Sequence, residues 1–94
     1  MRATLLLDER HQLDRAAFVA LRVWQVPSPV RGSQHAYKYA LAYIVDEVCV
    51  LRYDNEAGKG DHRHLGNRQT TYSFTTPENL LTDFWPDVDE WRSE

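Results

Sequence analysis

The thirteen residues from Arg52 to His64, RYDNEAGKGDHRH, contain two of the four histidines of the chain together with fixed charges and two glycines. Imidazole rings titrate near neutral pH, so a pair of them can take up and release protons within one reaction. If His62-Arg63-His64 is extended, the two histidines point to one face about 6.6 Å apart, and Arg63 points to the other face. One phosphate group fits between such a pair. The segment therefore predicts acid–base chemistry on a phosphodiester.

The matching reaction is a metal-independent cleavage of RNA. One neutral imidazole takes the proton from a ribose 2′-hydroxyl, and a second, protonated imidazole gives a proton to the leaving 5′-oxygen. The sequence does not assign these two parts between His62 and His64, and Asp61 is predicted to orient one of them. The groups expected to bind phosphate or stack on RNA bases are Lys59, Arg63, Arg52, Arg68 and Tyr53.

Other interpretations of the same segment stay open. The basic loop could belong to a binding module without catalysis, which docks on RNA, on a ribosome or on a protein partner. Asp61, His62 and His64 are chemically suited to hold a metal ion, with Asp54 or Glu56 completing the site. Their spacing matches no standard zinc site, so no metal and no other cofactor is predicted. A nucleotide-dependent enzyme, or a hairpin loop that is merely solvated, completes the alternatives.

The bulk composition limits the class of protein. Ninety-four residues predict one domain, spanning 1–94, and 43% hydrophobic residues provide a globular core. The net charge of −3 argues against a protein that coats nucleic acid non-specifically, because such proteins neutralise many phosphates. The longest apolar run, residues 40–45, is far too short to span a bilayer, and the N-terminus lacks a signal-peptide pattern. We expect a soluble cytoplasmic protein with no membrane contact.

Hydrophobic periodicity predicts the elements that carry the segment. Strands are expected at residues 3–7, 16–26, 37–45, 48–53, 62–64 and 70–74. A charged turn should follow residue 7, and Asp46-Glu47 should form a two-residue hairpin turn. Thr76-Pro77-Glu78 is a helix start, and Pro86 predicts a kink or a break in that helix. The expected fold is α+β: an antiparallel sheet of five to six strands with the C-terminal helix packed on one face.

The pattern Arg-Tyr-Asp-Asn at 52–55 with Gly-Lys-Gly-Asp-His-Arg-His at 58–64 resembles the TumE-like toxin family of bacterial type II toxin–antitoxin pairs. The likeness extends from Tyr37-Lys38-Tyr39 to Tyr72-Ser73-Phe74 and the Leu-rich helix, and it covers nearly the whole chain. It implies a small cytoplasmic toxin, encoded beside a helix-turn-helix antitoxin, that inhibits growth. The nuclease activity comes from the residue argument and from analogy with other small toxins. A chain this short also leaves a sheet face or an edge strand available for a homodimer.

Overall fold

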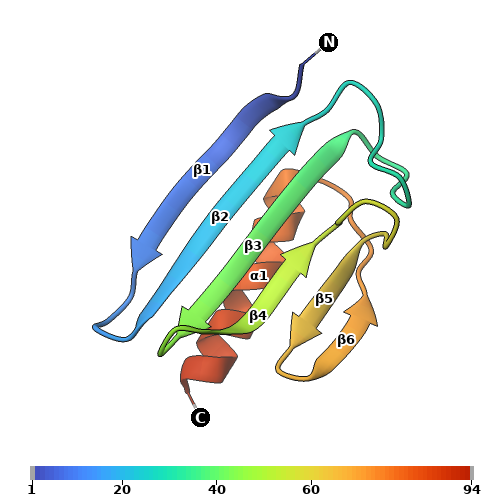
Figure 1. The fold of residues 1–94 in the computed structure, drawn as a ribbon. Coiled ribbons are helices and arrows are strands. Elements are labelled where there is room, and N and C mark those ends of the chain that lie inside the picture. The colour runs from blue at the N-terminus through green and yellow to red at the C-terminus, as the bar shows by residue number, and fades with distance from the viewer. Residues whose placement is uncertain (1, 94) are drawn as a thin grey trace.

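The computed structural model describes residues 2–93 as one six-stranded antiparallel sheet and one helix (Figure 1). The elements in chain order are β1 (Thr4–Gln12), β2 (Ala17–Gln25), β3 (Tyr37–Val45), β4 (Val48–Asp54), β5 (His62–Leu65), β6 (Arg68–Thr71) and α1 (Pro77–Arg92). The strands lie in the sheet in the same order as in the chain, so each pairs with its sequence neighbours. The predicted α+β architecture is confirmed. The helix lies across one face of the sheet and leaves the other uncovered.

The core lies between α1 and the sheet. Side chains alternate between the two faces of a strand, and the helix side of β2, β3 and β4 is almost wholly apolar or aromatic. The buried apolar residues are Ala17, Val19, Leu21, Val23, Tyr39, Leu41, Tyr43, Leu51, Tyr53, Leu80, Phe84 and Val88. The predicted inward positions Leu21 and Val23 and the outward position Arg22 are confirmed. We call the uncovered side the open face; it carries the residues that alternate with these core positions.

The sheet is larger at one edge than predicted. β1 continues to Gln12, because the acidic and basic residues after Leu7 pair across strands instead of turning: Arg22 Nε lies 3.2 Å from Asp8 Oδ1. At the other edge β6 ends at Thr71, so Tyr72–Phe74 lie beyond the strand expected at 70–74. Asp46 and Glu47 do form the hairpin turn, with φ of 50° and 68°, the left-handed values that a primed turn requires.

The helix begins as predicted, with the Thr76 hydroxyl accepting from the Asn79 backbone N–H and Pro77 in the first turn. α1 runs unbroken through Pro86, so the alternative of two separate helices is wrong. Pro86 and Thr82, whose carbonyl loses its usual partner, are both exposed, and water can satisfy that carbonyl. The described helix is neither long nor apolar enough to cross a membrane.

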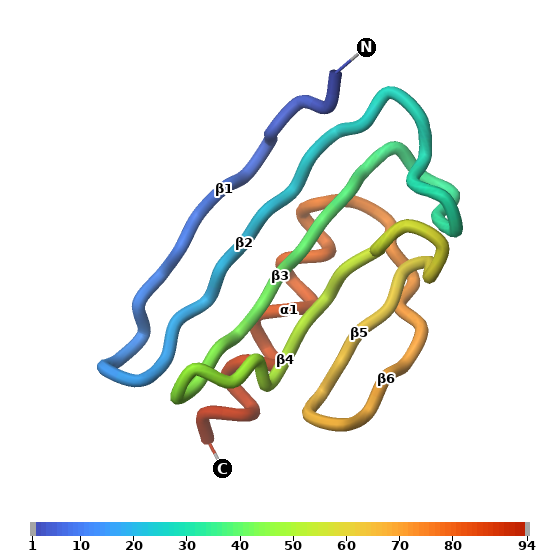
Figure 2. Tube along the Cα trace, in the orientation of Figure 1, coloured from blue at the N-terminus to red at the C-terminus, as the bar shows by residue number. Residues whose placement is uncertain are grey.

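Two loops meet where β3 begins, and Figure 2 shows them side by side. One joins β2 to β3 and the other joins β4 to β5. The backbone N–H of Gly58 donates to the carbonyl of Arg31 across 2.6 Å. A Cβ added at Gly32, which has φ of +96°, would lie 2.8 Å from the backbone nitrogen of Gly60. The approach is therefore too close for a side chain at Gly32.

Candidate active site

The two histidines of β5 lie on the same face of the sheet, as their spacing predicts, and that face is the open face. His62 is opposite Asp54 of β4, and His64 is opposite Arg52. The two imidazole centroids are 4.7 Å apart, with their planes inclined at 76°. Strand pairing thus brings two imidazoles, one carboxylate and one guanidinium into a single cluster, which we call the open-face cluster.

His62 is buried between two oxygen atoms. Its Nδ1 lies 2.9 Å from the carbonyl oxygen of Gly60, and its Nε2 lies 2.7 Å from Asp54 Oδ1. A carbonyl only accepts, so Nδ1 carries a proton, and Nε2 faces the carboxylate. Asp54 Oδ1 is a buried oxygen without a directed hydrogen bond among residues 2–93, so this contact is close but poorly aligned. The His62 ring therefore lies between two oxygen acceptors, of which only the Gly60 carbonyl is well aligned with it.

His64 differs from His62 in the groups that surround its ring. Desolvation lowers the pKa of His64 below its usual value, and the positive charge of Arg52 lowers it further. At neutral pH the ring is therefore uncharged. Nη2 of Arg52 lies 3.2 Å from His64 Nε2 and donates to its lone pair, while Nε of Arg52 lies 2.9 Å from Asp54 Oδ2. The guanidinium thus bridges the neutral histidine and the carboxylate.

Asp54, His62 and His64 also offer one ligand atom each within 4.8 Å of one another. Of the two carboxylates considered for completing a metal site, Asp54 lies in the cluster and Glu56 pairs with Lys59 instead. The hydrogen bond from His62 Nδ1 to Gly60 is the kind that fixes a metal-binding imidazole. Against a metal, Arg52 already supplies a cation to the same carboxylate.

Asp61 precedes His62 in the chain, yet its carboxylate belongs to a different cluster. Oδ2 accepts from His35 Nε2 at 2.6 Å and from the Tyr39 hydroxyl at 2.8 Å, and Oδ1 accepts from the Ser33 hydroxyl. His35 Nδ1 accepts from the Tyr37 backbone N–H, which assigns the Nε2-protonated tautomer. Asp61 therefore orients a histidine, but it is His35 and neither member of the predicted pair. Burial and the Asp61 carboxylate raise the pKa of Tyr39 well above its usual range.

We call this second group the loop cluster: Ser33, His35, Tyr39, Asn55 and Asp61. Asn55 is fully buried, and its amide donates to Ser33 Oγ and to the Tyr37 carbonyl while its oxygen accepts from the Tyr39 backbone. The His35 ring stacks on Phe74 at 4.0 Å between centroids. A shallow pocket of about 430 Å³ lies over this cluster.

Three further predicted residues lie on the helix side of the sheet. Tyr53 is buried and donates to Asp87 of α1, and Arg63 Nη1 lies 3.3 Å from the same carboxylate. Desolvation and this hydrogen bond raise the pKa of Tyr53 to about 12. Arg68 lines a pocket with Asp87, Glu90 and Trp91. Tyr53 and Arg63 thus connect the sheet to the helix, and within residues 2–93 none of the three forms a hydrogen bond or ion pair with His62 or His64.

Lys59 is the remaining predicted residue. It lies in the β4–β5 loop, well exposed, with Nζ 3.2 Å from Glu56 Oε2. Of the predicted residues, the structure thus brings together His62, His64 and Arg52.

Sequence reasoning gave little weight to Asp54 and His35. Asp54 follows from strand pairing, because Arg52 and Asp54 are two residues apart and face the same side as His64 and His62. His35 depends on the approach of two loops, and no local pattern indicates it.

Comparison with known proteins identifies a family. A family model described as "Toxin TumE" matches residues 2–92, which is nearly the whole chain. No curated protein and no solved structure matches the chain.

Proposed function

Since the chain belongs to the TumE family, and is thereby a toxin of a toxin–antitoxin system, we propose that it acts as a metal-independent endoribonuclease. The observation that carries the proposal is the difference in surroundings within the histidine pair of the open-face cluster. The lowered pKa of His64 leaves that ring neutral and able to accept a proton, while the His62 ring lies between the Gly60 carbonyl and the Asp54 carboxylate and is the proposed proton donor. RNA cleavage by 2′-hydroxyl attack needs one group of each kind.

In the proposed reaction His64 is the base. Nε2 of His64 is covered by Arg52 in the free protein, and a phosphodiester that draws the guanidinium to its oxygens exposes that nitrogen. His64 then takes the proton of the 2′-hydroxyl, and the 2′-oxygen bonds to the adjacent phosphorus. Arg52 stabilises the negative charge that develops on the phosphate oxygens.

His62 is the proton donor in this scheme. The bond from phosphorus to the 5′-oxygen breaks, the 5′-oxygen takes the proton from His62 Nε2, and a 2′,3′-cyclic phosphate remains on the other product. The His62 side chain is only 4% exposed. The leaving oxygen must therefore replace Asp54 at Nε2, and Asp54 acts by orienting the ring beforehand. The other predicted phosphate ligand near this edge is Lys59, whose loop position lets it reach the RNA backbone.

The toxin family supplies the expected partner. An antitoxin that silences the protein is implied by the family, and we propose that it is a helix-turn-helix protein acting in the cytoplasm on the same RNA-degrading site. An antitoxin that covers the open-face cluster would block substrate directly, because the cluster lies on the side of the sheet that α1 leaves uncovered.

The test is cleavage of a defined single-stranded RNA by purified protein in excess chelator. Wild type is compared with His64→Gln and His62→Gln, and the product ends are analysed. We expect 2′,3′-cyclic phosphates from wild type and a 10²- to 10⁴-fold loss of rate in each variant, an order of magnitude typical for acid–base groups. His11→Gln is the matched control, because His11 lies on β1 away from the cluster and is exposed.

Absence of cleavage by the wild type, while the same protein still arrests growth, would contradict the nuclease proposal. It would favour the binding module that docks on RNA, ribosome or antitoxin through the basic surface.

A second candidate rests on the convergence of Asp54, His62 and His64 within 4.8 Å. Three such ligands suit a metal-activated water in a metal-dependent hydrolase. Chelator separates the two candidates: cleavage that stops in chelator and returns with added Zn²⁺ or Mn²⁺ would support the metal-dependent enzyme.

A further inference from the structure

The open face carries more basic than acidic side chains. Its cations are Arg10, Arg22, Lys38 and Arg52, and its acids are Asp8 and Asp54. The helix on the other side carries five acidic residues and one basic residue, Arg92. A chain with a net charge of −3 thus separates its charges between two faces, and the uncovered face is the positive one.

Two cations on this face lie over aromatic rings. The guanidinium carbon of Arg10 is 3.8 Å from the centroid of Phe18, and Nζ of Lys38 is 5.5 Å from the ring of Trp24. Neither cation forms a salt bridge with any residue from 2 to 93. Each ring therefore presents an aromatic surface beside a charge that no carboxylate neutralises, the pairing that binds bases and phosphates of single-stranded nucleic acid.

Ala20 and Arg22 lie between Phe18 and Trp24 on the open face of β2, and Arg22 is paired with Asp8. One row of cross-strand neighbours runs Arg10, Ala20, Ala42, Arg52 and His64 from β1 to β5. The two alanines make a low floor between Arg10 and the open-face cluster. Phe18 and Trp24 stand on opposite sides of this row, six residues apart on β2 and hence about 20 Å apart along the strand. The row forms a shallow lane that leads to His64.

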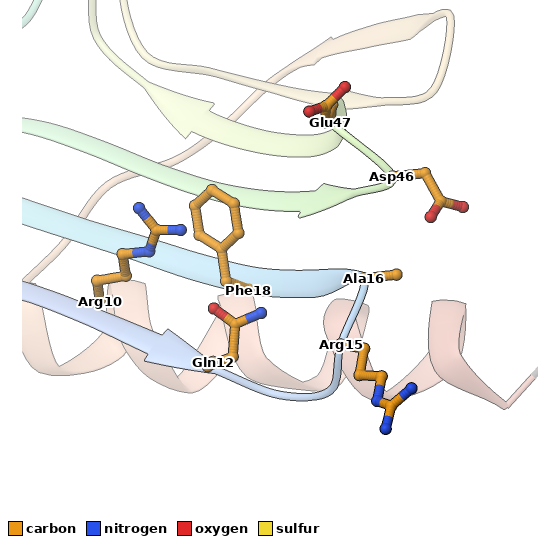
Figure 3. Close-up of a pocket in the computed structure, with 7 residues that line it drawn as sticks. All are labelled: Arg10, Gln12, Arg15, Ala16, Phe18, Asp46 and Glu47. Atoms are coloured by element: carbon orange, nitrogen blue, oxygen red, sulfur yellow. The ribbon is translucent and has the colours of Figure 1, made fainter.

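At its Arg10 end, opposite to His64, the lane opens into a pocket. About 490 Å³ of space is lined by Arg10, Gln12, Arg15, Ala16, Phe18, Asp46 and Glu47. Figure 3 shows Arg10 and Gln12 of β1 and Phe18 of β2 on one side of it, and Asp46 and Glu47 of the β3–β4 turn on the other. The two arginines suit a phosphate, and the glutamine and the acids offer acceptors and donors for a base edge.

We propose that the lane is the binding path for single-stranded RNA, with bases stacking on Phe18 and Trp24 and phosphates contacting Arg10 and Lys38. The strand then crosses Ala20 and Ala42 and presents a phosphodiester to Arg52 and His64. This inference rests on the proposed nuclease function and adds the substrate class and its path. We prefer RNA to a second copy of the chain as the ligand, because Arg10 and Lys38 form no salt bridge within residues 2–93 and can each pair with a phosphate.

The test is binding of a fluorescent 2′-O-methyl oligonucleotide of about eight nucleotides, within the usual site size for one single-strand-binding face. This probe cannot be cleaved, so affinity is measured independently of activity. The double variant Arg10→Gln/Lys38→Gln should bind roughly tenfold or more weakly, and its slope of log affinity against log salt should shrink by about 0.7 for each lost phosphate contact. The matched control is Arg2→Gln/Arg92→Gln, which changes the net charge equally and should bind within about twofold of wild type.

A second pair of variants tests stacking. Trp24→Leu and Phe18→Leu should each weaken binding by roughly fivefold or more and leave the salt slope unchanged, because each removes a ring and no charge. Far-ultraviolet circular dichroism of each variant shows that the sheet is retained.

Unchanged affinity and salt slope in the Arg10→Gln/Lys38→Gln variant would overturn the proposed path. So would loss of a homodimer or of antitoxin binding in these variants with RNA affinity intact, since the face would then belong to a protein partner. If the variants bind RNA as wild type does but His64→Gln still abolishes cleavage, the nuclease proposal is supported and the binding path is wrong. If wild type binds RNA through these residues but does not cleave it, the binding path is supported and the nuclease proposal is wrong.

Discussion

Two histidine–aspartate pairs lie close together in this protein and differ in how completely their hydrogen bonds are formed. In the loop cluster, the Asp61 carboxylate receives three donors, from Ser33, His35 and Tyr39. In the open-face cluster, the buried Asp54 Oδ1 has no aligned donor although His62 Nε2 is 2.7 Å away. A complete network stabilises one arrangement, whereas an incomplete one retains polar atoms that a ligand can satisfy.

From this contrast we infer a structural role for the loop cluster, beside the catalytic role that we propose for the open-face cluster. The loop cluster joins the β2–β3 loop to the β4–β5 loop beside the backbone contact from Gly58 to Arg31. The open-face cluster lies on strands β4 and β5, and the rigid sheet positions its side chains. Gly60, whose carbonyl accepts from His62 Nδ1, directly precedes Asp61 of the loop cluster, so the two clusters adjoin each other in the chain.

The largest expected effect is on catalysis. Asp54→Asn removes the carboxylate charge that lies 2.7 Å from His62 Nε2, and we expect RNA cleavage to fall by about 10²-fold. The free energy of unfolding should fall by only about 1 kcal/mol, because the contacts of Asp54 with His62 Nε2 and Arg52 Nε are not aligned hydrogen bonds within residues 2–93. Single-turnover cleavage and urea denaturation of the same preparation measure both quantities. A large loss of stability in Asp54→Asn with normal cleavage would mean that the open-face cluster has the structural role and not the catalytic one.

The next largest effect is on stability. Asp61→Asn removes a mostly buried charge that accepts from three side chains, and we expect the free energy of unfolding to fall by about 3 kcal/mol. Cleavage by the molecules that remain folded should stay within about threefold of wild type, because the Asp61 carboxylate accepts hydrogen bonds from Ser33, His35 and Tyr39 and from neither member of the histidine pair among residues 2–93. Urea denaturation and cleavage at a temperature well below the midpoint provide the two readings. An unchanged free energy of unfolding in Asp61→Asn would contradict the structural role of the loop cluster.

A smaller effect distinguishes the hydrogen bond from the aromatic packing in the loop cluster. Tyr39→Phe keeps the ring, which stacks on Phe74 at 5.2 Å, and loses the hydroxyl that donates to Asp61. We expect a loss of about 1 kcal/mol in the free energy of unfolding. Tyr37→Phe is the matched control, because its hydroxyl forms no hydrogen bond within the described residues, and it should lose less than about 0.5 kcal/mol. If both variants lose the same free energy of unfolding, the hydroxyl of Tyr39 contributes nothing specific and the aromatic packing accounts for the stability.

The smallest effect is on the pH dependence of stability. The pKa of His64 is lower in the folded protein than its unfolded value of 6.5, so the unfolded chain binds more protons below that pH. His64 therefore destabilises the fold as the pH falls through 6.5 toward its folded pKa. His64→Gln should remove this contribution and flatten the decline on the acid side, as measured by thermal unfolding between pH 7.5 and pH 5. An unchanged pH profile would mean that His64 is not desolvated.

Much of the fold follows from periodicity. Alternation in residues 16–26 and 37–45 identified β2 and β3 and their buried faces, because both strands are central and have one covered face. β1 was predicted too short, since an edge strand exposed on most of its length carries charges on both faces and shows no alternation.

The site was predictable where it depends on strand geometry. The same-face position of His62 and His64, and the opposite position of Arg63, follow from the two-residue period and are confirmed. The partner of Asp61 was not predictable in this way. Asp61 lies just before β5, and its neighbour His35 comes from a loop 26 residues earlier in the chain.

The order of the strands in the sheet determines which parts of the protein can fold while the chain is still being synthesised. Every strand pairs with the strand made just before it, so the contacts are local and the sheet can assemble quickly. Leu80, Phe84 and Val88, however, arrive last and cover the apolar side of that sheet. A chain that stops before residue 77 therefore contains every residue of the proposed active site and still exposes Leu41, Leu51 and their neighbours to water. We therefore expect the protein to become active only after α1 has been synthesised, and a nonsense mutation before residue 77 to abolish activity while leaving every residue of the proposed active site in place.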